Sequence, residues 1–368
     1  MPPKVMVVHN EGVIGGAERQ LSFVVEDLVR SGVTITYVHG NTGIAKWLPA
    51  EVHCIAGRLG VPGGRLKGLG AVTAVSFYQR DRWQAILRQQ QPDVVITTSF
   101  KEVVILSRIT RAPVVWLLHS PIYQTTWRRL CRVFNRDLKR VVIYGAGTNV
   151  IASLRRLGLD AKLLPIRIDS RGPGLANRSI RQSIVIGYVG RINKAKNVAM
   201  LVRTVQILKT RKIDAQLLVF GEGDTKDKLS RLACRLGVAD RVVVAGWKDN
   251  IVQALANDVD LLCYPSRDKG EARPAVIAEA RLAGLPVVAT STGDIPTLAR
   301  EDPCLHVVRP TPIGFADAVQ HWGTLKMRMP ECAEVPEWVQ MCYRTDVFRP
   351  VREAVLGLMA GYSMNDKN

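Results

Sequence analysis

The sequence lacks the features of disulfide-rich and membrane-spanning proteins. Its seven cysteines are scattered through 368 residues and form no Cys-x-x-Cys pair, so they indicate neither a disulfide framework nor a zinc site, and we expect them to be small core residues. No apolar run approaches the roughly 20 residues that a membrane-spanning helix needs, and the first residues form a strand-like segment rather than a signal peptide. We therefore expect an intracellular, cytoplasmic protein.

The sequence also has little that would hold a metal ion. It contains six histidines, and no Asp-x-Asp element stands at the end of an expected strand. A catalytic metal would need clustered carboxylates or histidines as ligands. We therefore predict no metal and no bound cofactor.

Acidic residues are too few to balance the basic ones. The chain has 51 Lys and Arg against 32 Asp and Glu, and residues 1–178 have 25 Lys and Arg against 11 Asp and Glu. Such a charge attracts polyanions, including nucleic acid, anionic lipid headgroups and phosphorylated substrates, and does not specify a fold. A basic nucleic-acid-binding α/β protein is one alternative, but no base-reading module or set of stacking aromatics accompanies the charge, so we expect no nucleic-acid partner.

What the sequence does contain is a regular alternation of short β-branched runs and amphipathic stretches. Strands are expected at 4–10, 33–40, 93–99, 113–120 and 140–147, and then at 184–190, 215–221, 242–246, 259–266 and 285–291. This alternation predicts parallel sheets with right-handed crossovers. A linker-like segment with glycine and proline, 169–179, divides the chain, so we predict two doubly wound, Rossmann-like α/β domains that face each other across a cleft, 1–172 and 173–346.

The turns after the first strand of each domain are suited to anion binding. Gly12, Gly15 and Gly16 lead into an amphipathic helix, so that backbone amides and a helix N-terminus point to the carboxyl edge of the sheet; the alternative is a tight turn without a ligand. In the second domain, Arg191 and Lys196 follow the strand directly. The arginine can contact a diphosphate as a forked donor and the lysine as a point charge. The alternative is that both are solvated surface cations.

Two further features lie after later strands of the second domain. Gly221 and Gly223 leave main-chain groups open to close approach by a ligand. Glu271 is expected in a loop and Glu279 in the helix that follows, so both carboxylates can face one crevice and accept hydrogen bonds from sugar hydroxyls. The spacing of the two glutamates is uninformative by itself, because Glu18 and Glu26, which we expect to be helix-surface charges, have the same spacing.

The order of these segments resembles the retaining nucleotide-sugar glycosyltransferases of family 4, which have the GT-B fold. The matching segments are GGAER (15–19), His119 at the end of VVWLLHS, GYVGRINKAKN (187–197), VFGEGD (219–224), AGW (245–247), YPS (264–266) and EARPAVIAEARLAGLPVVAT (271–290). The resemblance spans most of the chain. It is strong in the second domain and limited in the first to the glycine loop and His119.

The resemblance implies roles for individual residues. Arg191 and Lys196 would hold the donor diphosphate, Glu279 would accept hydrogen bonds from the ribose, and Glu271 would contact the donor hexose. The loop of Gly15 and Gly16 would approach the donor phosphate or the acceptor. His119 would lie near the transferred sugar, unless it is only a hydrogen-bonded histidine at a strand end. Further donor-binding positions are Gly190, Gly221, Glu222, Gly223, Trp247, Ala272, Arg273 and Pro274.

The chain departs from the family pattern at two places. Where the family commonly has Glu-Gly-Phe-Gly, residues 271–274 read Glu-Ala-Arg-Pro, so a flexible glycine is replaced and Pro274 has no amide hydrogen to donate. Asp294 and Thr297 stand where the family often has a glycine and a glutamate. These departures affect the expected hexose site and leave Arg191 and the other diphosphate residues unchanged.

The resemblance implies a retaining, metal-independent transfer of a hexose-type sugar from a UDP or GDP sugar to a glycan or lipid-linked acceptor, in cell-envelope polysaccharide or lipopolysaccharide synthesis. A nucleotide-sugar epimerase or hydrolase on the same scaffold is the alternative. The resemblance also implies that the C-terminal helical segment, 347–368, crosses back onto the first domain.

The first domain would then bind the acceptor. Its segment 125–140 interleaves apolar and basic residues, including Trp127, Arg128, Arg129 and Arg132. Such a helix can lie on an anionic membrane surface, or it can be a core-facing helix with a solvated basic side. With the basic segment 65–70, it favours an anionic or lipid-linked acceptor and a peripheral position at the cytoplasmic face of the membrane.

Overall fold

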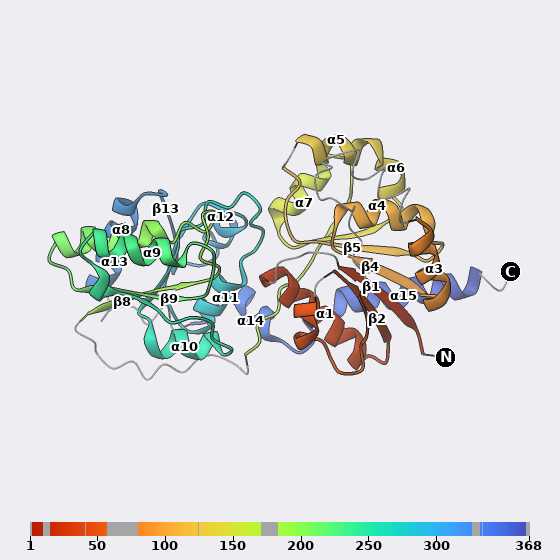
Figure 1. The fold of residues 1–368 in the computed structure, drawn as a ribbon, viewed down its shortest axis with the longest axis horizontal. Coiled ribbons are helices and arrows are strands. Elements are labelled where there is room, and N and C mark those ends of the chain that lie inside the picture. Colours follow the sequence, from red (N-terminus) through yellow and green to blue (C-terminus); the bar gives the residue numbers. More distant parts are fainter. Residues whose placement is uncertain are drawn as a thin grey trace. The chain divides into compact units, whose positions relative to one another are not determined.

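The computed structural model describes residues 2–9, 15–40, 42–56, 80–123, 125–170, 183–325, 332 and 334–365. The chain forms two compact units: unit 1 comprises residues 1–166 and 346–368, and unit 2 comprises residues 167–345 (Figure 1). None of the described helices combines the length and the apolar character needed to span a lipid bilayer. Three features singled out in the sequence lie wholly or mostly outside the described residues, namely Gly12, the segment 65–70 and the linker-like segment 169–179.

Unit 1 contains a seven-stranded sheet in the order β3-β2-β1-β4-β5-β6-β7, with every neighbouring pair parallel. Its strands are β1 (Lys4–His9), β2 (Thr34–His39), β3 (His53–Ala56), β4 (Val94–Thr97), β5 (Val114–Leu118), β6 (Val142–Gly145) and β7 (Lys162–Leu163). The central strands β4 and β5 are buried along their whole length, which is typical of parallel strands covered on both faces. The strand order reverses between β1 and β4, and ligands bind beyond the carboxyl ends of strands at such a point.

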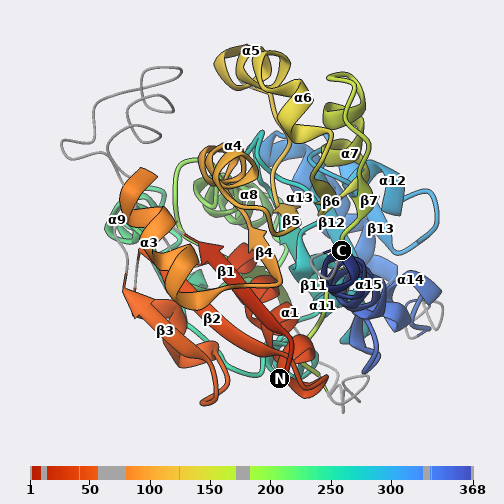
Figure 2. The same ribbon diagram turned by 90° about the vertical axis from the view of Figure 1, so that its right-hand side faces the viewer.

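The helices of unit 1 include the last helix of the chain. They are α1 (Gly16–Arg30), α3 (Arg80–Gln90), α4 (Phe100–Ile109), α5 (Thr125–Val133), α6 (Asn135–Leu138), α7 (Thr148–Arg155) and α15 (Arg349–Asn365), with the 3-10 helix η1 (Thr42–Trp47). Helix α15 packs against α1 and β4 (Figure 2). Arg352 donates to both carboxylate oxygens of Asp27 at 2.8 Å, and Tyr144 Oη donates to the Pro350 carbonyl at 2.9 Å. These bonds fasten the end of the chain to unit 1.

Unit 2 repeats the architecture with a six-stranded parallel sheet in the order β10-β9-β8-β11-β12-β13. Its strands are β8 (Ile184–Val189), β9 (Ala215–Phe220), β10 (Val242–Val244), β11 (Leu261–Tyr264), β12 (Val287–Thr290) and β13 (Leu305–Val308). Its helices are α8 (Ala199–Thr210), α9 (Lys226–Arg235), η2 (Ala239–Arg241), α10 (Ile251–Asp258), α11 (Ala275–Leu282), α12 (Ile295–Leu298), α13 (Pro312–Leu325), α14 (Glu337–Gln340) and η4 (Met341–Tyr343). Helices α8, α9 and α13 cover one face of the sheet, and α10 and α11 cover the other (Figure 1).

The structure confirms the predicted fold class, because both sheets are parallel and doubly wound. All ten predicted strands are present. The sequence pattern missed β3, β7 and β13, which lie at or beside the sheet edges and are more exposed than the central strands. Such short edge strands carry little of the apolar periodicity on which the prediction depends.

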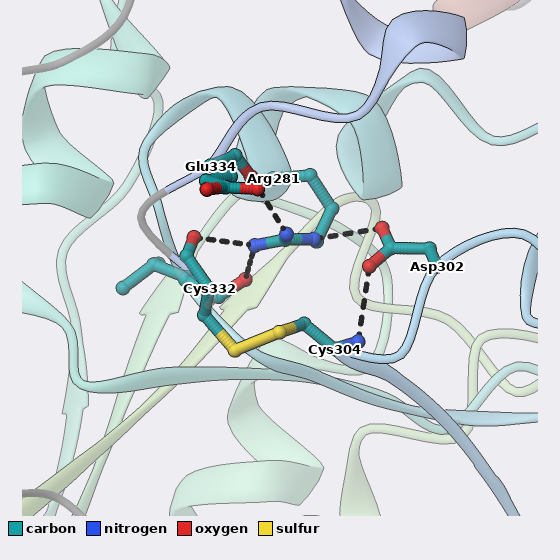
Figure 3. The surroundings of a disulfide bond; sticks show 6 residues. Arg281, Asp302, Cys304, Cys332 and Glu334 are labelled. Carbon is teal, nitrogen blue, oxygen red and sulfur yellow. Dashed lines mark hydrogen bonds and ion pairs between the residues drawn. A yellow bond between two sulfur atoms is a disulfide. The ribbon is translucent and has the colours of Figure 1, made fainter. Parts of the chain in front are cut away.

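The expectation that the cysteines form no disulfide is wrong for one pair. Cys304 and Cys332 are joined by a disulfide, although 28 positions separate them (Figure 3). Of the other cysteines, Cys131, Cys263 and Cys342 are buried, as expected, and Cys54 and Cys234 are exposed. Cysteine spacing could not reveal the bridge, because folding brings the start of β13 next to the segment that follows α13.

A buried arginine on α11 lies beside this disulfide (Figure 3). Arg281 is 1% exposed, and its Nε donates to Asp302 at 2.7 Å. Its other nitrogens donate to main-chain carbonyls, including those of Cys332 at 3.0 Å and Glu334 at 3.2 Å. Asp302 in turn accepts from the amide of Cys304 at 3.0 Å. The guanidinium therefore joins α11, the start of β13 and the segment after α13.

Candidate functional site

Two loops of unit 2, one after β8 and one after β11, bring Lys196 and Glu271 into an ion pair. The Lys196 Nζ also lies 3.5 Å from Asp268 Oδ2. The same oxygen of Glu271, Oε1, accepts hydrogen bonds from Tyr264 Oη at 2.5 Å and from Ser266 Oγ at 2.9 Å. Glu271 is 9% exposed, so the carboxylate is fixed by one cation and two hydroxyls in a largely dry position.

Tyr264 is fitted to the role of hydrogen-bond donor. Burial and the neighbouring Glu271 carboxylate raise the pKa of Tyr264 well above its usual value. The phenol therefore keeps its proton at neutral pH and donates a hydrogen bond to the carboxylate. Neither Tyr264 nor Ser266 was predicted as a site residue, although both belong to the YPS segment (264–266) that carries part of the family resemblance.

The loop after β8 also carries Arg191, whose side chain is exposed. Tyr188 Oη donates to the Arg191 carbonyl at 2.9 Å, and Asn193 Oδ1 accepts from the Lys196 amide at 2.9 Å. Among the described residues, the Arg191 guanidinium makes no hydrogen bond or ion pair. The two predicted diphosphate residues thus share one loop, the lysine paired with carboxylates and the arginine open to solvent.

The glycines near this loop have a packing requirement of their own. A Cβ at Gly221, where φ is +150°, would lie 2.0 Å from the carbonyl oxygen of Gly190, and a Cβ at Gly223 would lie 2.2 Å from that of Ile192. The Ile192 amide donates to the Glu222 carbonyl at 2.9 Å. We expected Gly221 and Gly223 to allow the close approach of a ligand, whereas in the structure it is the neighbouring loop that approaches them.

The loop from Glu271 to Pro274 is held by the loop after β12. The Ala272 carbonyl accepts from the Asp294 amide at 2.7 Å, and a Cβ at Gly293 would lie 2.0 Å from the same carbonyl oxygen. Arg273 Nε donates to Asp294 Oδ2 at 3.1 Å. The two departures from the family pattern, one in each loop, therefore form an ion pair with each other.

The remaining donor-binding candidates are more dispersed. Glu279 is half-buried on α11, whose N-cap is Pro274. Glu222, after β9, is exposed and paired with Lys226 at 3.0 Å. Trp247, after β10, is 65% exposed, and its Nε1 donates to Asp249 at 3.2 Å. Glu222 and Trp247 lie on carboxyl-edge loops, but the side-chain partners given above are close to them in sequence and are not Lys196 or Glu271.

In unit 1, Glu18 is a buried capping residue, so the expectation that it is a helix-surface charge is wrong. Its Oε2 accepts from the Gly15 amide at 2.6 Å, and its Oε1 lies 3.5 Å from His9 Nε2. Burial alone would raise the pKa of Glu18, but the neighbouring His9 and hydrogen bonds from backbone amides lower it, so the carboxylate is ionised. A glutamate in the first turn after a glycine N-cap was the available signal. Glu26, by contrast, forms a helix-surface pair with Arg30 at 2.5 Å.

His119 follows β5 at the carboxyl edge of the same sheet. Burial lowers the pKa of His119 to about 4, against the opposing effect of Glu18, so the imidazole is neutral at neutral pH. Its Nε2 is buried without a hydrogen-bond partner. Gly16 begins α1, and a Cβ there would meet no described atom within 4 Å. In the described ranges of both units, no group of three or more His, Cys, Asp and Glu is arranged to hold a metal ion.

The basic helix α5 has its apolar side against unit 1. Leu130 and Cys131 are buried, as is Phe134 just after the helix, and the Trp127 ring contacts Phe100 edge to face with ring centroids 5.2 Å apart. The side chains of Arg128, Arg129 and Arg132 are exposed. Of the two interpretations of this segment, the structure therefore shows the core-facing helix with a solvated basic side.

Comparisons with known proteins agree with this architecture. Residues 183–323 match the family Glycosyl transferases group 1. An uncharacterized glycosyltransferase of Methanocaldococcus jannaschii is 31% identical over 119 residues, which cover 32% of this chain and 30% of that protein. The chain thus aligns with less than two thirds of the length of its first curated relatives.

Two solved structures are similar over nearly the whole chain. The apo form of the lipopolysaccharide outer core galactosyltransferase WaaB has a TM-score of 0.70 at 15% identity, covering 96% of this chain and 99% of that one. HepE of Anabaena, in complex with UDP and glucose, has a TM-score of 0.68 at 17% identity, covering 99% of both chains. These findings confirm the resemblance to glycosyltransferases that the sequence indicated. The chain has the GT-B fold, and residues 183–323, within unit 2, are similar to the group 1 glycosyl transferases.

Proposed function

We propose that the protein is a glycosyltransferase that moves a sugar from a nucleotide diphosphate sugar to a glycan or lipid-linked acceptor. The observation that carries this proposal is the Lys196 and Glu271 pair, with Arg191 beside it, at the carboxyl ends of β8 and β11. Ligands of doubly wound sheets bind at this edge. The binding of UDP and glucose by the structural neighbour HepE supports a nucleotide-sugar donor.

The chemistry of the proposed reaction matches these charges. The bond between the sugar C1 and the phosphate oxygen breaks, and its electron pair leaves with the diphosphate. Positive charge from Arg191 and Lys196 stabilises that developing negative charge. The acceptor oxygen bonds to C1, and its proton passes to the departing phosphate, so no metal and no covalent enzyme intermediate is required. The family resemblance is also the basis on which we propose that the transfer retains the anomeric configuration and that the sugar is a hexose.

Glu271 and Lys196 can exchange partners without leaving a buried charge unpaired. The ammonium of Lys196 can donate three hydrogen bonds; it donates one to Glu271, and Asp268 is a second ion-pair partner. When the lysine turns to a phosphate, Tyr264 and Ser266 still donate to Glu271. The carboxylate then accepts from sugar hydroxyls, and Glu279 accepts from the ribose.

Unit 1 is proposed to bind the acceptor. The carboxyl edge of its sheet carries the neutral His119, and the ionised Glu18 lies at the start of α1. Such groups donate to and accept from hydroxyls, as an acceptor glycan requires. The similarity to WaaB, a lipopolysaccharide outer core galactosyltransferase, supports a role in cell-envelope polysaccharide or lipopolysaccharide synthesis.

Binding of nucleotide sugars tests the proposed function directly. We expect UDP or GDP sugars to raise the melting temperature of the protein, because a ligand that binds only the folded state stabilises it, and we expect oligonucleotides not to do so. Product analysis with glycan and lipid-linked acceptors then distinguishes transfer from hydrolysis and epimerisation. Stabilisation by oligonucleotides alone, or formation of a free or epimerised sugar without a transfer product, would contradict the proposal.

We also propose that unit 1 is attracted to anionic membranes through α5. Because the apolar side of α5 is buried, the attraction is electrostatic and depends on salt. Changing Arg128, Arg129 and Arg132 to serine is expected to weaken co-sedimentation with phosphatidylglycerol vesicles by the order of 100-fold, since each cation near the surface contributes about 1 kcal/mol. A matched variant with serine at the exposed residues Arg155, Arg156 and Lys162 should weaken it less. Equal losses in the two variants, or binding insensitive to salt, would overturn this proposal.

A further inference from the structure

Arg273, in the loop of Glu271 after β11, forms an ion pair with Asp294 in the loop after β12. Asp294 is fully buried, and the Arg273 side chain is 15% exposed. The backbone around them has little freedom, because the Asp294 amide donates to the Ala272 carbonyl and Gly293 has no room for a side chain. The hydrogen bond through Nε, at 3.1 Å, therefore ties the guanidinium to a buried carboxylate on a well-supported loop.

Arg281, eight positions later, shows how an arginine with a purely structural role is bonded in this unit. All three of its nitrogens donate to a carboxylate or to main-chain carbonyls, and the side chain is 1% exposed (Figure 3). Arg273 uses only Nε. Its two terminal nitrogens have no partner among the described residues, and they are not among the polar atoms sealed from solvent. A largely desolvated guanidinium thus offers an open fork.

We infer that Arg273 is a specificity-determining residue, and that its fork binds a carboxylate on the sugar of the donor. This inference rests on the proposed function and narrows the donor to a nucleotide diphosphate sugar of the uronic acid class. Arg273 lies two residues after Glu271, whose carboxylate is proposed to contact the donor sugar. We therefore place the charged group of that sugar beside the loop from Glu271 to Pro274, to which Arg273 belongs.

The chemistry favours a carboxylate over a neutral hydroxyl. An open fork donates two parallel hydrogen bonds to the two oxygens of a carboxylate, and these charge-assisted bonds are stronger than bonds to a hydroxyl. Lys196 does not compete for this anion, because it is paired with Glu271 and Asp268 and is proposed to turn from Glu271 to the donor phosphate. Asp294 holds the arginine through Nε and leaves the two terminal nitrogens to the ligand.

Matched pairs of donors test the inference. Dissociation constants are measured by calorimetry for UDP-glucose and UDP-glucuronate, for GDP-mannose and GDP-mannuronate, and for UDP and GDP alone. The wild-type protein is expected to bind the uronate of its preferred base at least about 10-fold more tightly than the neutral sugar, as a hydrogen-bonded charge pair implies. In the double variant R273Q/D294N, which removes both charges of this ion pair, the preference is expected to disappear while the affinity for the nucleotide alone stays within about 2-fold.

Two further variants separate the fork from its charge. R273K keeps the charge without the fork and is expected to retain only part of the preference. R267Q removes an exposed cation from the same loop and is expected to leave the preference intact. Equal binding of both sugars by the wild-type protein, or a preference that survives in R273Q/D294N, overturns the inference while the proposed function stands. Failure of UDP and GDP to bind at all overturns both.

Discussion

Replacing Lys196 with alanine is expected to lower kcat/KM for sugar transfer by about 10²- to 10³-fold, the effect of removing one fixed group that stabilises charge in a transition state. The ammonium is positioned at the carboxyl end of β8 by Glu271 and Asp268, so it need not reorganise far to meet a departing diphosphate. Initial rates over a range of donor concentrations, with the nucleotide sugar identified by thermal stabilisation, measure the effect.

Lys194 provides the matched control, because it is an exposed lysine in the same loop. Lys194→Ala removes the same charge from the chain and is expected to change kcat/KM by less than about 3-fold, since screening weakens the effect of exposed charges. Urea unfolding checks that Lys196→Ala is folded. We expect it to fold, because Tyr264 and Ser266 still donate hydrogen bonds to Glu271. Equal rates for wild type and Lys196→Ala would show that the ion pair is structural and would remove the basis of the proposed site.

The core of both sheets was predictable because apolar runs and glycine turns record it locally. Strands β4, β5, β11 and β12 are continuous apolar segments that end in polar loops, so the sequence placed Lys196 and Glu271 at the same edge of one sheet. Their direct pairing was not predictable. It depends on the strand order, which makes β8 and β11 neighbours although 75 positions separate the two side chains.

Other features were hidden because they depend on distant residues. Arg273 and Asp294 were each visible as departures from a family pattern, but their ion pair exists only because the loops after β11 and β12 touch. The sequence pattern of Glu18 is that of a helix-surface charge, whereas in the structure Glu18 lies in the first turn of α1, beside His9. The disulfide between Cys304 and Cys332 likewise follows from the return of the chain to β13 after α13.

Arg281→Met is expected to destabilise unit 2 by about 3–5 kcal/mol, because it leaves a buried carboxylate without its cation. Asp302 is 1% exposed, and the one other hydrogen bond that its carboxylate accepts from the described residues comes from the Cys304 amide at 3.0 Å. The carbonyls of Cys332 and Glu334 also lose their donor. Urea unfolding followed by tryptophan fluorescence reports the loss, since Trp322 is buried in the core of unit 2.

The double variant Arg281→Met with Asp302→Leu distinguishes charge from packing. If the cost of the single variant is mainly the uncompensated carboxylate, removing both charges should recover a large part of the lost stability, since a buried ion pair is often replaceable by apolar groups. Arg300→Met, at an exposed arginine of the same unit, is expected to change the unfolding free energy by no more than about 0.5 kcal/mol. If the double variant is as unstable as the single one, the bonds to the Cys332 and Glu334 carbonyls, and not the ion pair, hold α11 to the disulfide-linked segment.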